Sequence, residues 1–493
     1  MKKYIVVLLT AALLLCGCDQ QIDENIVVIN DTENVSEDTS ETSTVPVNTV
    51  TSNGEKTYVE LSSGNIEITE GGIYELSGTL ENGCVIVDVD DDEDVEIILS
   101  GVSIYTENFA SIYIVNGDEA TITLKEGTVN RLSTGSSYTQ IDENSVDAVI
   151  YSKADLFLGG KGTLIIEANY KHGIVSKDDL VITGGVYEIT ALNHALVGKD
   201  LVEIHDGIFT LTTGKDSIVS DNEDDKDRGN VVIHDGNFTI TSSADGIYAV
   251  NTLTIEDGSY EIDTVKKVLK ADAEILISGG TFVIDAEDDG IHTDGSLTIS
   301  GGKITLKSGD DAIHAEYKLT IKDGTLDLTA HEGLEATLVT IDGGDITISA
   351  SDDGINAGAQ VSGVTPTVEI NGGNLTITMG QGDTDAIDSN GNLIINGGTV
   401  TISAQFPFDY DQTGQLNGGT VIVNGEEVSQ LSNQFGGMGG MGGGNWPNGG
   451  FPSGQGGMNP PDGNFPGGGS TPPSGGGFPG GNGPQGGSPG GRR

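Results

Sequence analysis

The sequence has few cysteines, few aromatic residues and few basic residues. Lys and Arg together number 22 against 75 Asp and Glu, which gives a formal net charge of −53. A chain this acidic is repelled by nucleic acid and by anionic membrane surfaces, so its charge excludes both as partners. Of the three cysteines, only Cys84 lies beyond the first twenty residues. No disulfide framework is therefore expected, and Cys84, in an apolar run, is predicted to be a buried, inert thiol.

The N-terminus has the pattern of an export signal. Two lysines precede an apolar run at 4–15 that is too short for a comfortable membrane span. The run ends in Leu15-Cys16-Gly17-Cys18, which resembles a bacterial lipobox and implies cleavage after Gly17 and lipid on Cys18. The alternative is an ordinary secretory signal with a chance cysteine. We predict a signal peptide at 1–17 and a cell-surface lipoprotein, outside the cytoplasm, that touches the membrane only through its lipid.

Two segments lack any helical or strand periodicity. Residues 18–56 are acidic and rich in Ser and Thr, and residues 431–493 are dominated by Gly, Pro and Asn. Neither composition can bury a core, so we predict a disordered tether and a disordered tail. The residues between them carry the acidity and the structure.

The middle of the chain is a repeat. A Gly-Gly or Asp-Gly turn recurs about every 22 residues from Gly185 to Gly419, with occasional insertions. Apolar and polar residues alternate on both sides of each turn, which is strand periodicity, and no stretch of ten residues has a helical period. Three short strands per repeat with one apolar face form one coil of a parallel β-helix. We predict an all-β solenoid with irregular capping coils at 57–140 and regular coils at 141–430.

Coils of a parallel β-helix stack about 4.8 Å apart, so equivalent residues form columns. The aromatic column Tyr187, Phe209, Phe238, Tyr260 and Phe282 is predicted to stack in the core. Ile291 points inward by the same alternation, so Asp289 and His292 beside it are expected to point outward.

Carboxylates stacked at this spacing repel each other by about 3–4 kcal/mol at an effective dielectric of 20, a cost that a divalent cation would remove. Ca²⁺ prefers hard oxygen ligands, and paired carboxylates at turns supply them. The alternative is that these are solvated acidic turns, since Asp-Gly is good turn chemistry. A transition metal on the histidines is a further alternative. The predicted calcium ligands are Asp288, Asp289, Asp310, Asp311, Glu332, Asp352, Asp353 and Asp385.

One coil places lysines where its neighbours have carboxylates. Lys266 and Lys267 replace the acidic pair, and Lys270 falls in the histidine column. The repeat predicts that this column consists of Tyr248, Lys270, His292, His314, Glu335, Asn356 and Asp388. Lys267 could simply compensate the neighbouring aspartates. Alternatively, the three lysines bind an anionic ligand, or one of them acts as the base of a β-elimination beside bound Ca²⁺. The predicted ligand-binding residues are Lys266, Lys267, Lys270, Tyr248, His292 and His314.

The repeat Asp-Asp-Gly-Ile followed by Leu-x-Ile-x-Gly-Gly, with the lipoprotein signal and the Gly-rich tail, resembles a bacterial family of carbohydrate-binding domain-containing proteins. The resemblance covers about 60–430. It implies a right-handed parallel β-helix similar in shape to pectate lyases, an association with calcium, and binding of cellulose or acidic plant polysaccharides such as polygalacturonate. The lysine coil and the coil with His331 and Glu332 depart from the pattern.

Three functions follow as hypotheses. The first is a monomeric surface lipoprotein that binds acidic polysaccharide or cellulose through a Ca²⁺-loaded ladder, without catalysis. The second is a calcium-dependent polysaccharide lyase that uses Lys266, Lys267 or Lys270 as its base. The third is a structural or adhesive solenoid with no sugar ligand.

Overall fold

Strands make up all the regular secondary structure of the described residues, which are 26–27, 46–52, 54–382 and 384–433 of the computed structural model. Among these residues no helix is long and apolar enough to cross a membrane. The predicted signal peptide, Cys18, most of the predicted tether and nearly all of the Gly-rich tail lie outside the described residues. So does the second of the two units into which the chain divides, Gly440–Arg493.

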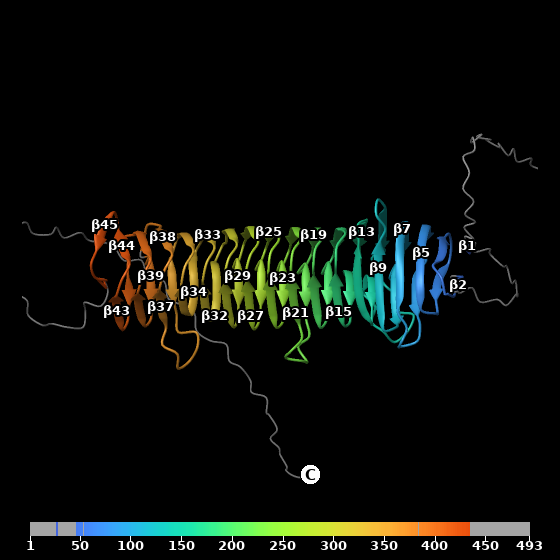
Figure 1. Ribbon diagram of the computed structural model, residues 1–493, viewed down its shortest axis with the longest axis horizontal. Coiled ribbons are helices and arrows are strands. Elements are labelled where there is room, and N and C mark those ends of the chain that lie inside the picture. Colours follow the sequence, from blue (N-terminus) through green and yellow to red (C-terminus); the bar gives the residue numbers. More distant parts are fainter. Residues whose placement is uncertain (1–25, 28–45, 53, 383, 434–493) are drawn as a thin grey trace, which may run out of the picture. The chain divides into compact units, whose positions relative to one another are not determined.

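The strands form the coils of a parallel β-solenoid, which confirms the predicted fold class. In the regular coils, each strand pairs in parallel with the strand three places later, such as β16 with β19 and β19 with β22. One coil therefore contributes one strand to each of three sheets, and Figure 1 shows the coils following one another in sequence order. A long strand spans two sheets where a corner is straight, as in β5, β7, β32 and β34.

The first sheet carries the candidate site. It contains the N-terminal parts of β32 (Asp311–Ile321) and β34 (Glu332–Ile341). Its other strands are β2 (Val47–Val50), β4 (Asn65–Ile68), β6 (Val85–Asp88), β8 (Ile112–Asn116), β11 (Ala148–Ser152), β14 (His172–Ser176), β17 (Leu196–Gly198), β20 (Ile218–Ser220), β23 (Ile247–Ala249), β26 (Leu269–Ala271), β29 (Ile291–Thr293), β36 (Ile355–Ala357), β39 (Ile387–Ser389) and β42 (Asp409–Tyr410).

The second sheet takes the N-terminal parts of β5 (Gly72–Glu81) and β7 (Val95–Thr106) and the C-terminal parts of β32 and β34. Its other strands are β1 (Ile26–Val27), β3 (Thr57–Leu61), β9 (Glu119–Leu124), β12 (Asp155–Gly160), β15 (Asp179–Ile182), β18 (Leu201–Ile204), β21 (Asn230–Ile233), β24 (Thr252–Ile255), β27 (Glu274–Ile277), β30 (Ser296–Ile299), β37 (Thr367–Ile370), β40 (Asn392–Ile395) and β43 (Thr413–Leu416).

The third sheet takes the C-terminal parts of β5 and β7. Its other strands are β10 (Val129–Thr134), β13 (Thr163–Ala168), β16 (Val186–Ala191), β19 (Ile208–Thr213), β22 (Asn237–Ser242), β25 (Ser259–Thr264), β28 (Thr281–Ala286), β31 (Lys303–Lys307), β33 (Thr325–Ala330), β35 (Asp345–Ala350), β38 (Asn374–Met379), β41 (Thr399–Ser403), β44 (Thr420–Val423) and β45 (Glu426–Val428).

The interior is filled by the apolar columns that the alternation predicts. The third-sheet strands bury every second residue, and the five predicted aromatic residues form one continuous core stack. Ring centroids of successive members lie 4.5 to 5.1 Å apart with nearly parallel planes, from Tyr187 to Phe282. The turn glycine directly before each third-sheet strand from β16 to β44 has a positive φ, for example 121° at Gly258, a conformation that side-chain-bearing residues resist.

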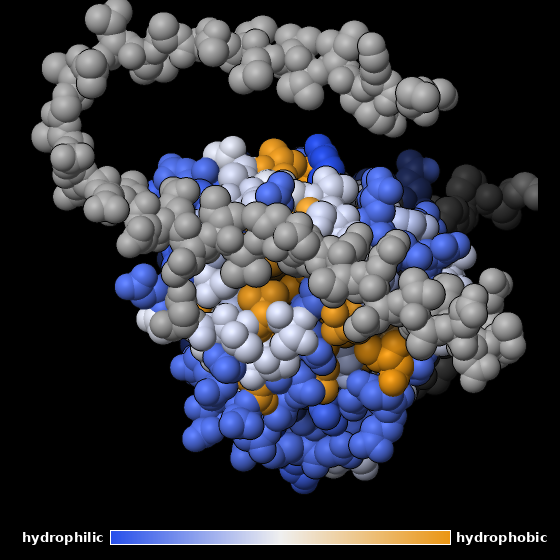
Figure 2. Space-filling view, turned by 90° about the vertical axis from the view of Figure 1, so that its right-hand side faces the viewer, coloured by the Kyte–Doolittle hydropathy of each residue, from blue (hydrophilic) through white to orange (hydrophobic). Residues whose placement is uncertain are grey.

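The two ends of the solenoid differ. At the C-terminal end β45 pairs antiparallel with β44, so the last parallel edge of the third sheet is occupied by a hairpin. Figure 2 views the β1 end, where hydrophobic residues gather centrally and hydrophilic residues surround them. The predicted capping region, 57–140, joins the same three sheets, with register shifts at Leu76/Gly78 and Val87/Asp88. The strands β1 and β2 fall within the stretch predicted to be a tether.

Candidate functional site

One outward-facing column of the first sheet changes its chemistry along the solenoid. We call it the outward column. The register confirms the predicted alignment of Tyr248, Lys270, His292, His314, Glu335, Asn356 and Asp388. It also extends the column in both directions, to apolar residues before Tyr248 and to Asp409 after Asp388. The added members are Tyr113, Tyr151, Val175, Val197, Val219 and Asp409.

The apolar end of the outward column is covered. Tyr113 and Tyr151 belong to a second hydrophobic cluster, separate from the core, with Phe109 and Val146 from the loops beside them. The phenol of Tyr113 donates to Asp142 at 2.7 Å, which fixes the second of these loops on the sheet. Cys84 is buried in the same cluster, and burial raises the pKa of its thiol. The uncovered part of the column therefore begins near Tyr248.

A second column lies beside the first, at the corner where each first-sheet strand begins. We call it the corner column: Asp216, Asp245, Lys267, Asp289, Asp311, Glu332, Asp353 and Asp385. Asp289 is more buried than its predicted outward direction suggests: the residue is 4% exposed and Asp311 is 6% exposed, and the Asp289 carboxylate contacts Lys267 and His292. Within the paired carboxylates, Asp288 is half-buried and Asp310 is exposed, so the second Asp of each pair is the inner one.

Four carboxylates of the corner column are bound by the backbone of the next coil. In these four pairs of adjacent coils, an Oδ1 atom accepts a hydrogen bond from the backbone N–H of the following column member, at 2.9 to 3.2 Å. Each such bond brings the partial positive charge of an amide hydrogen next to a carboxylate. This attraction offsets part of the repulsion between the carboxylates of neighbouring coils. The pairs are Asp216–Asp245, Asp245–Lys267, Asp289–Asp311 and Asp353–Asp385.

Lys267 compensates the aspartates of the next coil. Its Nζ lies 2.9 Å from Asp288 Oδ2 and 3.0 Å from Asp289 Oδ2, and its side chain is 19% exposed. Burial alone would lower the pKa of Lys267, but the hydrogen bonds to Asp288 and Asp289 raise it above its ordinary value. Lys267 therefore stays protonated near neutral pH. This geometry supports internal charge compensation and disfavours Lys267 as a general base.

The other two predicted lysines differ from Lys267. Lys266 is exposed. Lys270 lies in the outward column with its Nζ 4.5 Å from the centre of the Tyr248 ring and 3.9 Å from Asp272 Oδ1. The Tyr248 hydroxyl donates to Asp272 Oδ2 at 3.0 Å. Tyr248 and Lys270 thus form a partly exposed aromatic and cationic pair on the outward column.

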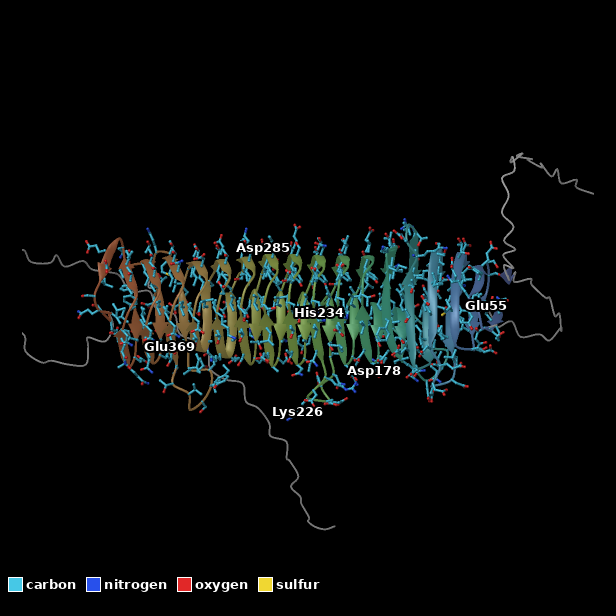
Figure 3. The ribbon with its side chains drawn as sticks, viewed as in Figure 1. Glu55, Asp178, Lys226, His234, Asp285 and Glu369 are labelled. Carbon is cyan, nitrogen blue, oxygen red and sulfur yellow. The ribbon has the colours of Figure 1, made fainter. Side chains whose placement is uncertain are left out.

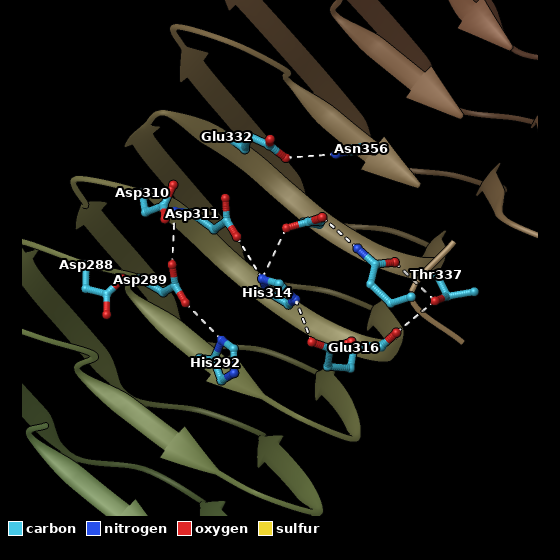
Figure 4. A network of polar contacts seen from close by, with 12 residues as sticks. Asp288, Asp289, His292, Asp310, Asp311, His314, Glu316, Glu332, Thr337 and Asn356 are labelled. Atoms are coloured by element: carbon cyan, nitrogen blue, oxygen red, sulfur yellow. Dashed lines mark hydrogen bonds and ion pairs between the residues drawn. The ribbon is translucent and has the colours of Figure 1, made fainter. Parts of the chain in front are cut away.

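The two predicted histidines link the two columns (Figure 4). His292 Nδ1 lies 2.8 Å from Asp289 Oδ2, and His314 Nδ1 lies 2.7 Å from Asp311 Oδ2. His314 Nδ1 also lies 3.1 Å from Glu335 Oε2. Although burial favours the neutral imidazole, these carboxylates raise the pKa of His314.

Neutralisation of the corner column therefore extends as far as His314. Asp289 is held ionised: burial opposes its charge, but His292 and Lys267 lower its pKa to about 2.

Beyond Lys322 the only basic side chain near the carboxylates in sequence is His331, which directly precedes Glu332. The sequence contains no Lys or Arg between Lys322 and Arg492. Burial, with the nearby charges of Asp388 and Glu332, raises the pKa of Asp353 to about 7. Burial and the charge of Asp409 raise the pKa of Asp388 to about 6.

We call this region the acidic segment: Glu332, Glu335, Asp352, Asp353, Asp385, Asp388 and Asp409. Donor atoms of His331, Glu332 and Asp352 lie within 4.8 Å of one another, and Asn356 Nδ2 donates to Glu332 Oε2 at 3.0 Å. Carboxylate and amide oxygens at this density suit a hard divalent cation.

Sequence analysis did not separate this segment from the self-neutralised coils before it. The absence of lysine and arginine between Lys322 and Arg492 is the feature of the sequence that distinguishes the acidic segment from the earlier coils. Asp388, which is central to the segment, appeared only as a member of the histidine column and not among the predicted calcium ligands.

Comparison with known proteins gives a family and two relatives. The profile of a family described as carbohydrate-binding domain-containing proteins matches residues 62–312, 253–385 and 310–429. A carbohydrate-binding domain-containing protein of Acetivibrio thermocellus is 34% identical over 135 residues, which are 27% of this chain and 47% of that protein. The chain therefore spans about half the length of this relative.

A solved structure, described as the gadolinium derivative of a polysaccharide lyase-like protein from C. thermocellum, is 32% identical to this chain. The alignment has a TM-score of 0.40 and covers 41% of this chain and 83% of the other. Because the family profile covers most of the sequence and all of the regular coils, this chain belongs to the family of carbohydrate-binding domain-containing proteins.

Proposed function

We propose that this chain binds acidic polysaccharide, of the polygalacturonate type, along the outward column, with Ca²⁺ bound by the acidic segment. The observation that carries the proposal is the raised pKa of Asp353 and Asp388 in a region without lysine or arginine. A raised pKa means that the ionised carboxylates repel their neighbours. A bound divalent cation removes that repulsion and so stabilises the ionised form.

The charge of the protein makes such a cation necessary for an acidic ligand. A chain with a formal net charge of −53 repels a polyuronate at long range. A Ca²⁺ ion with six to eight oxygen ligands can accept some from the protein and the rest from sugar carboxylates. Lys270 and Tyr248, further along the same column, offer a cation and an aromatic ring to the same extended ligand.

Calcium titration followed by sugar titration tests this function. We would titrate the full chain, freed of metal with a chelator, with Ca²⁺ in a calorimeter, and then add oligogalacturonate with and without Ca²⁺. The expected result is calcium binding that is required for sugar binding. Sugar binding that survives the chelator would overturn the bridging mechanism, and absence of both would favour the adhesive or structural alternative.

Two variants locate the calcium site. Asp353→Asn and Asp388→Asn remove one charge each at little change in volume and should weaken Ca²⁺ binding by about tenfold or more. Asp327→Asn is the matched control, because Asp327 is an exposed acid on the third sheet. Equal affinities in all three variants would place calcium elsewhere.

The lyase alternative makes a separate prediction. A lyase would release unsaturated products that absorb near 235 nm when the chain is mixed with polygalacturonate and Ca²⁺ at alkaline pH. The protonated, doubly paired Lys267 does not favour that reaction, and Lys266 and Lys270 are the residues left to test by substitution.

We further propose that lipid on Cys18 holds the chain on the outer side of a membrane. Cys18→Ser should release the protein from the membrane fraction, whereas Cys16→Ser should not. Release by both or by neither would contradict lipidation at Cys18.

A further inference from the structure

A cluster of two histidines and two glutamates lies on the second sheet, apart from the outward column. His205, His234 and Glu256 each follow the last residue of a second-sheet strand, at β18, β21 and β24. The register aligns those last residues, so the three side chains occupy the same position in three successive coils. Figure 3 labels His234 on the solenoid, away from both ends of the stack of coils. Glu203, inside β18, completes the cluster.

Three donor atoms of this cluster converge. Glu203 Oε1 lies 2.8 Å from His234 Nε2 and 3.5 Å from His205 Nε2. All three ligand atoms lie within 4.8 Å of one another. Tetrahedral zinc with ligands at 2.0–2.1 Å requires donor atoms about 3.3 Å apart. The two separations fall on either side of that value, and the third, between the two histidine nitrogens, is at most 4.8 Å. Both imidazole rings would have to turn from their stacked arrangement towards the ion to complete the geometry.

The fourth residue orients the cluster. His234 Nδ1 lies 2.9 Å from Glu256 Oε2. A carboxylate on one ring nitrogen of a ligating histidine fixes the tautomer and turns the other nitrogen towards the metal. With Nδ1–H donating to Glu256, the lone pair of His234 Nε2 points to the side where Glu203 and His205 lie.

A protonated His234 between two glutamates explains only part of this arrangement. The hydrogen bonds to Glu256 and Glu203 do raise the pKa of His234. However, the ring of His205 stacks on that of His234 with centroids 4.6 Å apart, and its Nε2 approaches the same Glu203 oxygen. A cationic His234 would attract the face of the His205 ring, so the stacking alone does not require a metal. The approach of both Nε2 atoms to one Glu203 oxygen does not follow from the stacking. A metal ion shared by both imidazoles and Glu203 accounts for all three contacts.

We propose that Glu203, His205 and His234 bind a transition-metal ion of the zinc class, with Glu256 as the positioning residue and a fourth coordination position open to water. The side chains of His205, His234 and Glu203 are 47%, 31% and 28% exposed, so the ion would exchange with solvent. A bound ion would join the two successive coils that contain β18 and β21, through side chains that lie outside the core. The site is chemically distinct from the oxygen-rich acidic segment, because imidazole selects zinc, nickel or copper over calcium.

Zinc titration of the full chain tests this proposal. The chain, freed of metal and then saturated with Ca²⁺ to occupy oxygen sites, is titrated with Zn²⁺ in a calorimeter. We expect His205→Ala and His234→Ala each to lose one equivalent of zinc relative to the unaltered chain. Glu256→Gln should keep the stoichiometry but weaken that equivalent by about 10- to 100-fold.

Control variants separate this site from other histidines. His292→Ala and His194→Ala remove histidines elsewhere and should leave the equivalent assigned to His205 and His234 intact. Cobalt in place of zinc should give a visible absorption band that disappears in His234→Ala and persists in His194→Ala. The proposal is overturned when zinc stoichiometry and the cobalt band are the same in His205→Ala, His234→Ala and the unaltered chain, or when the unaltered chain binds no zinc. Neither result depends on whether the outward column binds sugar.

Discussion

The carboxylate of Asp289 accepts a hydrogen bond from the backbone N–H of Asp311, one coil further along, at 3.2 Å. The same relationship recurs along the corner column, so a buried acid in one coil helps to hold the backbone of the next. Repeated carboxylates are tolerated there because four of them, Asp216, Asp245, Asp289 and Asp353, accept a hydrogen bond from a backbone N–H. Asp289 also contacts Lys267 and His292. The corner column is therefore structural in its lysine and histidine coils.

Replacing Lys267 should destabilise the solenoid. Lys267→Met would leave Asp288 and the buried Asp289 without their shared cation, which costs about 2–3 kcal/mol for a pair that is only partly buried. Chemical denaturation followed by circular dichroism measures this loss. The control is Lys266→Met, because Lys266 is the exposed neighbour and should change stability by less than about 0.5 kcal/mol. Equal effects of the two variants would mean that the ion pairs of Lys267 contribute nothing.

The metal-free chain should become more stable as the pH falls from about 8 to 5. The folded-state pKa values of Asp353 and Asp388, about 7 and about 6, exceed that of an unfolded aspartate, about 4. The folded state therefore binds more protons between these values, and the free energy of unfolding rises as the pH falls through them. The lowered pKa of Asp289 acts in the opposite direction only below about pH 4. Burial lowers the pKa of His172 to about 4, which offsets part of the gain below about pH 6.5.

Thermal unfolding in a chelator at pH 8 and pH 5.5 measures this dependence. Asp353→Asn should reduce it, and Ca²⁺ at pH 8 should raise the melting temperature of the unaltered chain. A melting temperature that falls on acidification would show that the acidic segment is not under electrostatic strain.

Removing one ring from the aromatic stack should cost about 3–5 kcal/mol. Phe238 is 2% exposed and lies between Phe209 and Tyr260, with centroids 4.8 and 4.9 Å away, so Phe238→Ala would leave a cavity with two stacking partners lost. Val283→Ala, on the outer face of the same sheet, is the control, since Val283 is 55% exposed. Urea denaturation compares the two, and similar midpoints would contradict a close-packed interior at this position.

Lys270→Gln should weaken binding of oligogalacturonate by about tenfold and leave binding of a neutral oligosaccharide unchanged. The substitution removes the cation that the outward column presents beside Tyr248. Lys303→Gln, at an exposed position on the third sheet, is the matched control. Fluorescence anisotropy with a labelled oligosaccharide measures both, and a loss of affinity that is equal for the two variants would indicate long-range charge rather than contact.

The fold could be predicted from the sequence because the repeat length sets the register. A period of about 22 residues places His292 beside His314, and the alternation around Ile291 assigns it to the core; the structure confirms both. The burial of Asp289 could not be predicted in this way. This residue precedes the strand, so alternation does not reach it, and its partner is a backbone N–H that belongs to another coil.

The repeat pattern also could not predict that loops cover one end of the outward column. Phe109 and Val146 lie in loops between strands, and no period relates them to Tyr113 and Tyr151, which they cover. Only the folded chain shows that the column is closed at one end and open at the other.

Sequence order and spatial order coincide along the first sheet, because each coil pairs only with the coils before and after it. Exchange of two whole coils would therefore exchange the surface residues that those coils contribute to the outward column. The apolar columns of the interior would stay the same. Duplication or deletion of a coil would likewise lengthen or shorten the outward column by one residue. A gene that gains or loses such a unit can change the length of its exposed surface column without redesigning the core.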